Sequence, residues 1–429
     1  MHNTLAFTLG SFNLQHVWIL AVGVLVFTVV YHAAFLIYNI YFHPLSKYPG
    51  PRLAAASPLW LASSYIGGKT PADLLELHNR YGPVVRTSPG ELSYINAPQW
   101  KEIYGYKAGQ LEFSKDKKYF SGLKGEPLIL NADRHYHGYI RKLVAHGFSE
   151  KAMREQESVL KQYVDLMFRR VEEEAQDGTQ PVDMLKWFNE KVKHRLNTQP
   201  TVPDFMDKLI AAYNSGKMSF GQLEGNSQIL IAAGSETTAT HLSGLTWLLM
   251  KNPRVMEKLA TEVRTAFSHP DEITFTGVNN CKYLLACIEE GLRVYPPSPQ
   301  PHHRIVPPGG ATVNGEFLPE GVSVSIPIYA ASNSSANWTR PGEFIPERWL
   351  GENPEFDGDQ RDASQPFQMG PRACVGRNLA YAEIKLIMAR LIWQFDIENV
   401  TEKDWMGSQK VFMVWEKMPL WIKLHPVRQ

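Results

Sequence analysis

A cysteine set between two glycines and beside an arginine has the clearest potential for chemistry in this sequence. It lies in the run F-Q-M-G-P-R-A-C-V-G, from Phe367 to Gly376, and Cys374 is one of three cysteines in the chain. From Asn378 onward the apolar residues recur at helical spacing, so the cysteine directly precedes a predicted helix. The free N–H groups and positive dipole end of a helix favour a thiolate. Held against a flat cofactor, such a thiolate is suited to be the axial ligand of haem iron.

The residues around this cysteine agree with a large planar ligand. Gly370 permits a tight turn, and Gly376 lacks a side chain where a flat group would lie close. Arg372 is placed to pair with a carboxylate such as a haem propionate. The alternative is a small buried cysteine without a ligand role. A zinc or iron–sulfur site is disfavoured, because neither Cys281 nor Cys287 stands at ligand spacing.

A polar motif interrupts a long helical pattern that runs from Ser219 to Met250. The motif is I-A-A-G-S-E-T-T-A-T, in which Gly234 lowers the helix propensity and the threonines are β-branched. Such side chains invite hydrogen bonds to the backbone and a local distortion. One interpretation is a distorted core helix. The other is a slot for a diatomic ligand, with the hydroxyl of Thr237 and the carboxylate of Glu236 at its rim.

Charged residues at helical spacing form a third group. His137 and Arg141 lie four residues apart, so they share one face of a predicted helix, for which a solvated basic face is the alternative. Glu290 and Arg293 lie three residues apart and are suited to a salt bridge. Arg348, in the run F-I-P-E-R-W, offers a second guanidinium for the same carboxylate.

Together these motifs resemble the cytochrome P450 family. The cysteine run matches the family's haem-binding signature F-x-x-G-x-R-x-C-x-G at every fixed position, and A-G-S-E-T-T matches its oxygen-activation motif. The helix of Glu290 resembles the family's E-x-x-R helix. The resemblance covers the chain from about Tyr48 to its end, apart from one gap. It implies a mainly α fold with small β-sheets, an α+β haem-thiolate fold.

The resemblance also implies which residues hold the cofactor, haem b. Cys374 would be the axial ligand of the haem iron. The other residues that would contact the cofactor, several of them through its propionates, are Arg372, Arg304, His137, Arg141, Phe367 and Gly376.

Further roles follow from the same resemblance. Thr237 would hold O2 and a water by hydrogen bonds, and Glu236 would relay protons from solvent. Glu290, Arg293 and Arg348 would be structural, fixing the loop before the haem ligand. Two electrons would come from NADPH through a membrane-bound flavoprotein reductase.

The implied reaction inserts one oxygen atom from O2 into a lipophilic small molecule. The runs P-E-R-W-L and W-E-K-M-P-L resemble fungal members of secondary metabolism, which indicates a terpenoid or polyketide-like substrate. Two alternatives stay open. One is a haem-thiolate isomerase or dehydratase, and the other is a truncated, catalytically impaired haem-binding membrane protein.

The N-terminal residues predict a membrane anchor. Residues 17–42 contain no Asp, Glu, Lys or Arg and are long enough to span a bilayer as one helix. Residues 1–16 would be lumenal, 43–52 would form a proline-rich linker, and 53–429 would be the catalytic domain. Basic residues follow the span but do not precede it, which predicts a single-pass protein of the endoplasmic reticulum with a cytosolic domain. The net charge of +1 gives no reason to expect a nucleic-acid partner.

One part of the chain is shorter than the family pattern. Residues 142–236 alone separate Arg141 from Thr237, whereas family members place several more helices there, some of which roof the substrate pocket. We expect an internal deletion near residues 187–197. Apolar surface beside the oxygen motif would then be exposed.

Overall fold

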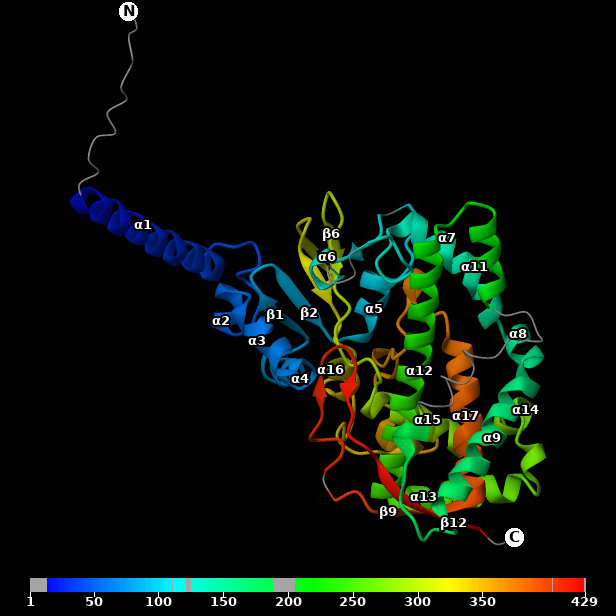
Figure 1. Cartoon of the computed structure of the whole chain (residues 1–429). Coiled ribbons are helices and arrows are strands. Elements are labelled where there is room, and N and C mark those ends of the chain that lie inside the picture. Colours follow the sequence, from blue (N-terminus) through cyan, green and yellow to red (C-terminus); the bar gives the residue numbers. More distant parts are fainter. Residues whose placement is uncertain (1–13, 110, 121–124, 188–204, 403, 428–429) are drawn as a thin grey trace, which may run out of the picture.

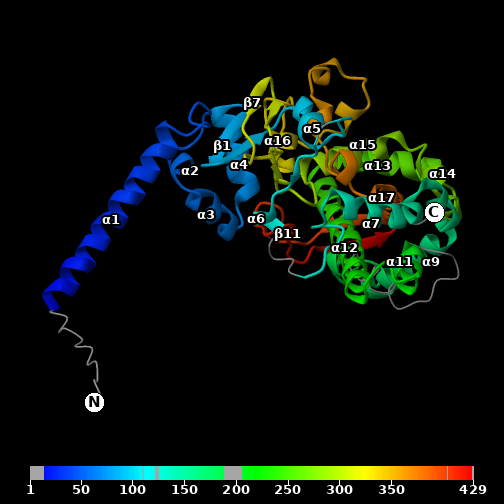
Figure 2. The ribbon, with the colours of Figure 1, turned by 90° about the horizontal axis from the view of Figure 1, so that it is seen from above.

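The computed structural model describes residues 14–427 except 110, 121–124, 188–204 and 403. A long N-terminal helix points away from the rest of the molecule, a small β-rich region adjoins its end, and a larger helical body follows (Figure 1). The same separation is visible from above (Figure 2). Most of the segment near 187–197, where we expect a deletion, lies outside the described residues.

Helices dominate the described chain, as the mainly α fold class predicts. They are α1 (Leu14–Tyr41), α2 (Arg52–Ala56), α3 (Leu59–Gly67), α4 (Thr70–Tyr81), α5 (Ala97–Tyr104), α6 (Lys117–Phe120), α7 (Arg134–Ala145), α8 (Glu150–Glu155), α9 (Glu157–Ala175), α11 (Phe205–Asn214), α12 (Phe220–Lys251), α13 (Pro253–Ala266), α14 (Phe275–Val278), α15 (Lys282–Val294), α16 (Ile328–Asn333) and α17 (Arg377–Gln394).

The strands form small sheets. They are β1 (Val84–Ser88), β2 (Glu91–Tyr94), β3 (Ser114–Lys115), β4 (Val182–Asp183), β5 (Arg304–Ile305), β6 (Ala311–Val313), β7 (Glu316–Leu318), β8 (Ser323–Ser325), β9 (Phe395–Asn399), β10 (Lys410–Val411), β11 (Trp415–Glu416) and β12 (Trp421–Pro426).

A five-stranded sheet in the order β1-β2-β8-β5-β3 joins segments that are far apart in the sequence. The pairing of β2 with β8 is parallel and the others are antiparallel. A three-stranded sheet has the order β4-β12-β9, and β6–β7 and β10–β11 are hairpins. A hairpin over 309–327, which strand alternation predicts, is too long. The hairpin ends at Leu318, and residues 323–325 form β8, because their backbone pairs with β2 and β5 instead.

Helix α1 is free of charged residues, and its side chains are exposed from Gln15 to Tyr38. The stretch Gln15–Tyr41 has a mean hydropathy of 2.3, and the 28 residues of the helix extend roughly 42 Å at about 1.5 Å per residue. This exceeds the hydrocarbon thickness of a bilayer, about 30 Å. The helix is therefore compatible with a membrane anchor.

The end of α1 is attached to the β-rich region by hydrogen bonds. The buried Asn39 donates to the carbonyl of Ala56 over 3.0 Å, and Arg86 of β1 donates to the carbonyl of Asn39 over 2.8 Å. Beside this junction, α2 and α3 expose three large apolar side chains to solvent. These are Leu53, Leu59 and Ile66, between 73% and 80% exposed.

Helix α12 crosses the helical body (Figure 1). It begins with a capping box in which Ser219 and Gln222 satisfy each other's backbone N–H groups. From Thr238 to Leu249 its residues are buried in the largest hydrophobic core, which α9, α13, α15 and α17 share. The helix is continuous over its 32 residues, so the predicted distortion does not interrupt it.

A buried ion-pair network fixes α15 to the segment after α16. The carboxylate of Glu290 accepts two hydrogen bonds from Arg293, each of 2.8 Å, and one from Arg348 of 3.1 Å. It also accepts from the backbone N–H of Ile345 and the indole N–H of Trp349, both at 2.9 Å. The side chains of Glu290 and both arginines are fully buried. Every oxygen lone pair of this carboxylate thus has a donor, which a buried charge requires.

The network extends toward the segment that leads to Cys374. Arg348 also forms a buried ion pair with Asp359, whose other oxygen accepts from the N–H of Thr339 over 2.6 Å. Four residues later the carbonyl of Ala363 accepts from the buried indole N–H of Trp100 in α5, over 3.1 Å. These contacts anchor the chain at several points before it reaches the cysteine.

Replacing Arg348 with methionine should lower the free energy of unfolding by about 3–5 kcal/mol, because it leaves Glu290 and Asp359 buried without their shared cation. Arg254→Met is the matched control, since Arg254 is an exposed partner of Glu347, and it should cost within about 1 kcal/mol. Denaturant unfolding checks both values. Equal losses in the two variants would contradict a dominant role for the buried network.

Candidate active site

The loop that carries Cys374 is shaped by a turn and a close backbone contact. The backbone N–H of Cys374 donates to the carbonyl of Phe367 over 2.8 Å. Gly370 has a φ of +74°, and a Cβ added there would lie 1.9 Å from the carbonyl oxygen of Tyr104. Only glycine fits this position. Cys374 therefore lies just ahead of α17, which begins at Arg377, as the sequence predicts.

Opposing influences act on the thiol of Cys374. Its side chain is exposed at one side, yet the surrounding protein displaces enough water to raise the pKa of the thiol above its usual value. The backbone N–H of Gly376 and the positive charges of Arg141 and Arg377 lower this pKa in part. Within the protein alone the thiol is favoured, so a bound metal ion would be needed to stabilise the thiolate.

Gly376 and Gly234 have no steric reason to be glycine within the described protein. A Cβ at Gly376 would make ordinary contacts of 3.9 Å to Phe148 and 4.0 Å to Cys374, and its φ is −86°. A Cβ at Gly234 in α12 would meet nothing within 4 Å. Chain packing thus leaves both positions open, and each has room for a flat ligand beside its backbone.

Basic side chains from four segments gather beside the cysteine loop. Arg141 of α7 donates to the carbonyl of Ala373 and so ties this helix to the residue before Cys374. One turn earlier, His137 is buried, and its pKa is lowered to about 4 by burial and by the positive charges around it. Those charges belong to Arg372, Arg141, Lys115 and Arg304, in order of decreasing effect.

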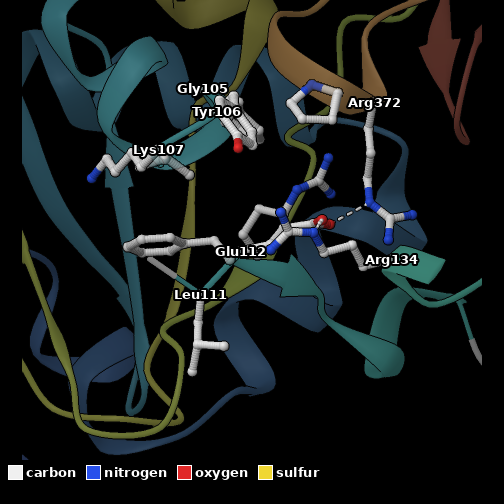
Figure 3. A pocket seen from close by; sticks show the side chains of 12 residues that line it. Gly105, Tyr106, Lys107, Leu111, Glu112, Arg134 and Arg372 are labelled. Atoms are coloured by element: carbon white, nitrogen blue, oxygen red, sulfur yellow. Dashed lines mark hydrogen bonds and ion pairs between the residues drawn. The ribbon is translucent and has the colours of Figure 1, made fainter. Parts of the chain in front are cut away.

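Arg372 already has an acidic partner, Glu112 (Figure 3). The Nε of Arg372 donates to the Glu112 carboxylate over 2.6 Å, and its Nη1 donates to the carbonyl of Ala132 over 3.0 Å. Arg134 approaches the other carboxylate oxygen to 3.9 Å. These side chains line a small pocket together with Arg304.

Arg304 is a buried cation and Lys115 is half-buried, and among the described residues the hydrogen bonds of both go to backbone carbonyls. Arg304 donates to the carbonyl of His303 over 3.3 Å and lies over the ring of Tyr104. Lys115 donates to the carbonyl of Leu130. Burial, followed by the charges of Arg304 and Arg372, lowers the pKa of Lys115 to about 7.

The charge balance of this cluster fits a ligand with two carboxylates. Four arginines and one lysine gather near the carboxylate of Glu112 in the described part of the site: Arg134, Arg141, Arg304, Arg372 and Lys115. Burying an excess of like charge is costly unless counter-charges are present. The two propionates of haem would supply them, and Cys374 would supply a ligand for its iron. The residues present therefore fit haem.

The oxygen motif lies on the half-buried first part of α12. The hydroxyl of Thr237 donates to the carbonyl of Ala233 over 2.6 Å, and Glu236 forms an ion pair with Lys417. No contact in the described residues joins these side chains to Cys374. The oxygen motif and the cysteine loop are nevertheless connected through packing. Residues 229–230 of α12 and Val375, next to Cys374, pack against the same apolar cluster.

Comparison with known proteins identifies the chain. The family model described as Cytochrome P450 matches residues 180–420. "Cytochrome P450 monooxygenase hepD" of Aspergillus oryzae is 39% identical over 98% of both chains.

The chain belongs to the cytochrome P450 family.

Other fungal relatives of this cytochrome P450 have similar coverage. "Cytochrome P450 monooxygenase astA" of Talaromyces wortmannii is 38% identical over 95% of this chain and 97% of its own. "Averantin hydroxylase" of Dothistroma septosporum is 35% identical over 91% of this chain and 88% of its own. The relatives are monooxygenases, and the protein is accordingly a cytochrome P450 monooxygenase with the haem cofactor of that family.

The alignment to the first relative is longer than the chain itself. It runs over 498 positions, whereas the cytochrome P450 described here has 429 residues, so at least 498 − 429 = 69 positions of the relative face gaps. Both chains are nevertheless covered almost from end to end. This cytochrome P450 therefore lacks internal residues that its relative has.

Sequence reasoning did not select three residues of the site. Glu112 and Lys115 precede α6 in a segment of mixed charge, and Lys417 follows β11 near the C-terminus. Their partners are more than a hundred positions away in the cases of Glu112 and Lys417. The only local signal was the W-E-K-M-P-L run, in which Glu416 and Lys417 stand between apolar residues.

Gly370→Ala should abolish assembly of the cysteine loop, because the added methyl would overlap the Tyr104 carbonyl at a strained positive φ. We expect little or no haem-bound protein, measured as haem absorbance per protein after purification. Gly358→Ala is the control, since a Cβ at Gly358 meets nothing within 4 Å. Normal haem content in Gly370→Ala would show that the loop has another conformation.

Proposed function

We propose that this monooxygenase inserts an oxygen atom from O2 into a lipophilic small molecule, at a haem bound between the Cys374 loop and α12. The observation that carries this proposal is the excess of buried basic side chains beside Cys374. When bound, a thiolate-ligated haem supplies the chemistry of O2 reduction and oxygen insertion. The substrate class that fits the sequence is terpenoid or polyketide-like, from fungal secondary metabolism.

Each residue of the loop then has a task. Cys374 would be the axial ligand, with its sulfur held by the turn at Gly370 and oriented by the N–H of Gly376. Arg141 supports this position, because its bond to the Ala373 carbonyl fixes the backbone next to the sulfur. Phe367 packs against Tyr381 of α17 with 5.0 Å between ring centres, and so closes one side of the loop.

The propionates would be bound by the basic cluster. In the part of the chain that the structure describes, Arg304 and Lys115 donate to backbone carbonyls and not to a carboxylate. Arg372 shares the carboxylate of Glu112 with Arg134. His137 is held neutral by burial and these cations, so it would donate a hydrogen bond rather than a charge. The positive surroundings keep the propionates ionised.

On the other side of the haem, the oxygen motif would manage O2 and protons. Thr237 would turn its hydroxyl from the Ala233 carbonyl to a bound diatomic molecule or water. Glu236, whose side chain is 40% exposed, has solvent contact and would carry protons inward. Glu290, Arg293 and Arg348 would not touch the substrate; their network would hold the loop that carries the sulfur.

Electron supply and location complete the proposal. NADPH would donate through a membrane-bound flavoprotein reductase, which would reach the haem from the cysteine side. A groove there is lined by three basic residues, Arg154, Arg377 and Lys385, and by two acidic ones, Glu150 and Glu289. Its basic residues would meet an acidic partner surface. With α1 as a single-pass anchor in the endoplasmic reticulum, the catalytic domain would face the cytosol.

A second candidate function is that of a catalytically impaired haem protein. Two observations favour it: internal residues of the relative are absent from this chain, and α12 is exposed at Ala232, Ala233 and Gly234. In that case haem would bind, but the substrate pocket would be incompletely covered. Absence of a substrate-induced spectral shift across a panel of lipophilic compounds, in haem-loaded protein, would support this candidate.

The reduced, carbon-monoxide-bound absorption spectrum tests the ligand. The wild-type protein should show the strongly red-shifted Soret band of thiolate-ligated haem. Cys374→Ala should lose this band, because no other described cysteine can reach the iron. Cys281→Ala should keep it, since Cys281 is buried at the start of α15. A wild-type spectrum typical of imidazole ligation would refute the proposal.

Lys115→Met should weaken haem retention. A charge-assisted hydrogen bond contributes about 1.5–3 kcal/mol, so haem transfer to excess apomyoglobin should speed up about tenfold or more. Lys117→Met is the control, because Lys117 is exposed on α6, two residues away. Identical transfer rates for Lys115→Met and wild type would remove Lys115 from the cofactor site.

A further inference from the structure

Lys417 is a buried cation whose ammonium group is bound to the oxygen motif. Its side chain is only 4% exposed, and it donates to the carboxylate of Glu236 and, over 3.2 Å, to the carbonyl of Trp415. A buried ammonium is costly unless a counter-charge is present. Glu236 supplies that charge, so the C-terminal segment and the middle of α12 are joined by an ion pair.

The backbone around Lys417 is anchored on both sides. Before it, the indole N–H of Trp415 donates to the carbonyl of Pro296 over 2.8 Å, and its ring stacks on Tyr295 at 4.6 Å. After it, Leu420 is fully buried, and its N–H donates to Asp183 over 3.1 Å. The position of the ammonium group is therefore set by the fold as well as by its flexible stem.

Glu236 is turned toward Lys417 and not toward the neighbouring threonine. Side chains at adjacent positions of a helix do not face each other, and the hydroxyl of Thr237 is bonded to the carbonyl of Ala233. The phenol of Tyr295 is close enough to sense the charge of Glu236, but it donates to Gln409 over 2.6 Å. In this arrangement no described hydrogen bond links Glu236 to Thr237.

We propose that Lys417 is a positioning residue that holds Glu236 in a resting orientation, from which the carboxylate must be released to carry a proton. The inference rests on the proposed role of Glu236 as the proton carrier. Release exchanges the ammonium for water at the exposed side of Glu236 and brings the carboxylate toward Thr237. The strength of the ion pair would then limit how often protons are delivered.

A purely structural tether is the competing explanation for the same contact. As a tether, Lys417 would stabilise the C-terminal segment without affecting proton delivery. The two explanations differ in how variants at the two positions combine. If Lys417 acts through Glu236, its replacement has no effect on turnover once the carboxylate is absent. If Lys417 is only a tether, its replacement would lower the stability of the protein and would leave proton delivery through Glu236 unaffected.

The test measures NADPH oxidation and hydrogen peroxide release by haem-loaded, full-length protein with a cytochrome P450 reductase, without organic substrate. Lys417→Met should raise the NADPH oxidation rate by about threefold or more, because the carboxylate is freed as a proton carrier. Lys417→Arg should retain the wild-type rate. Glu236→Gln and the double variant with Lys417→Met should be equally slow.

Thermal unfolding of the wild type, Lys417→Met, Glu236→Gln and the double variant forms a double-mutant cycle, which measures the ion pair independently of turnover. We expect a coupling between the two positions. Lys186→Met is the matched control, since Lys186 forms a surface pair with Glu174 over 3.3 Å, and it should change neither the oxidation rate nor the coupling.

An unchanged or lowered oxidation rate in Lys417→Met, with a lowered unfolding temperature, would overturn the proposal and leave a tether. The proposal would also be overturned if the effects of Lys417→Met and Glu236→Gln on the oxidation rate multiplied independently in the double variant. The carbon monoxide spectrum separates this failure from failure of the proposed function. A wild-type protein with the thiolate band but without the predicted epistasis would refute only the role of Lys417.

Discussion

A single buried carboxylate constrains the arrangement around the active site. Glu290 takes five hydrogen bonds from two arginines, an indole and a backbone amide, and all of its charged partners are buried. Such a cluster is stable only in one geometry, since displacement of any donor leaves a charge unsolvated. The cluster thereby fixes where α15 ends and where the long irregular segment before Cys374 begins. Without it, that segment has few regular hydrogen bonds to define its course.

Charge organises the cofactor region in a different way. Around Glu290 the positive and negative groups balance, whereas beside Cys374 the cations exceed the carboxylate that faces them. The first arrangement is complete within the protein, and the second fits a dianionic ligand. Burial, and after it this excess of positive charge, lowers the pKa of Lys115 and of His137. The cost of burying unpaired charge thus distinguishes the two clusters: the one around Glu290 is structural, and the one beside Cys374 is suited to a ligand.

The motifs with local signals could be predicted from the sequence. The spacing of Glu290 and Arg293, the helix after Cys374 and the long helix with Thr237 all depend on residues within one or two turns. The contacts of Glu112 and Lys417 depend on chain segments brought together by sheets and hairpins, which no local pattern reveals. The predicted hairpin over 309–327 was too long for the same reason, because β8 pairs with β2 from the far N-terminal side.

The attachment of α1 restricts how the catalytic body can be oriented. Since Asn39 is bonded to Ala56 and to Arg86, the helix axis and the β-rich region do not swivel freely about each other. If α1 crosses a bilayer, the exposed Leu53, Leu59 and Ile66 lie where the body meets the headgroups and would be drawn into the lipid. The catalytic body would then lie against the membrane surface. A lipophilic substrate would reach the enzyme by lateral diffusion in the bilayer.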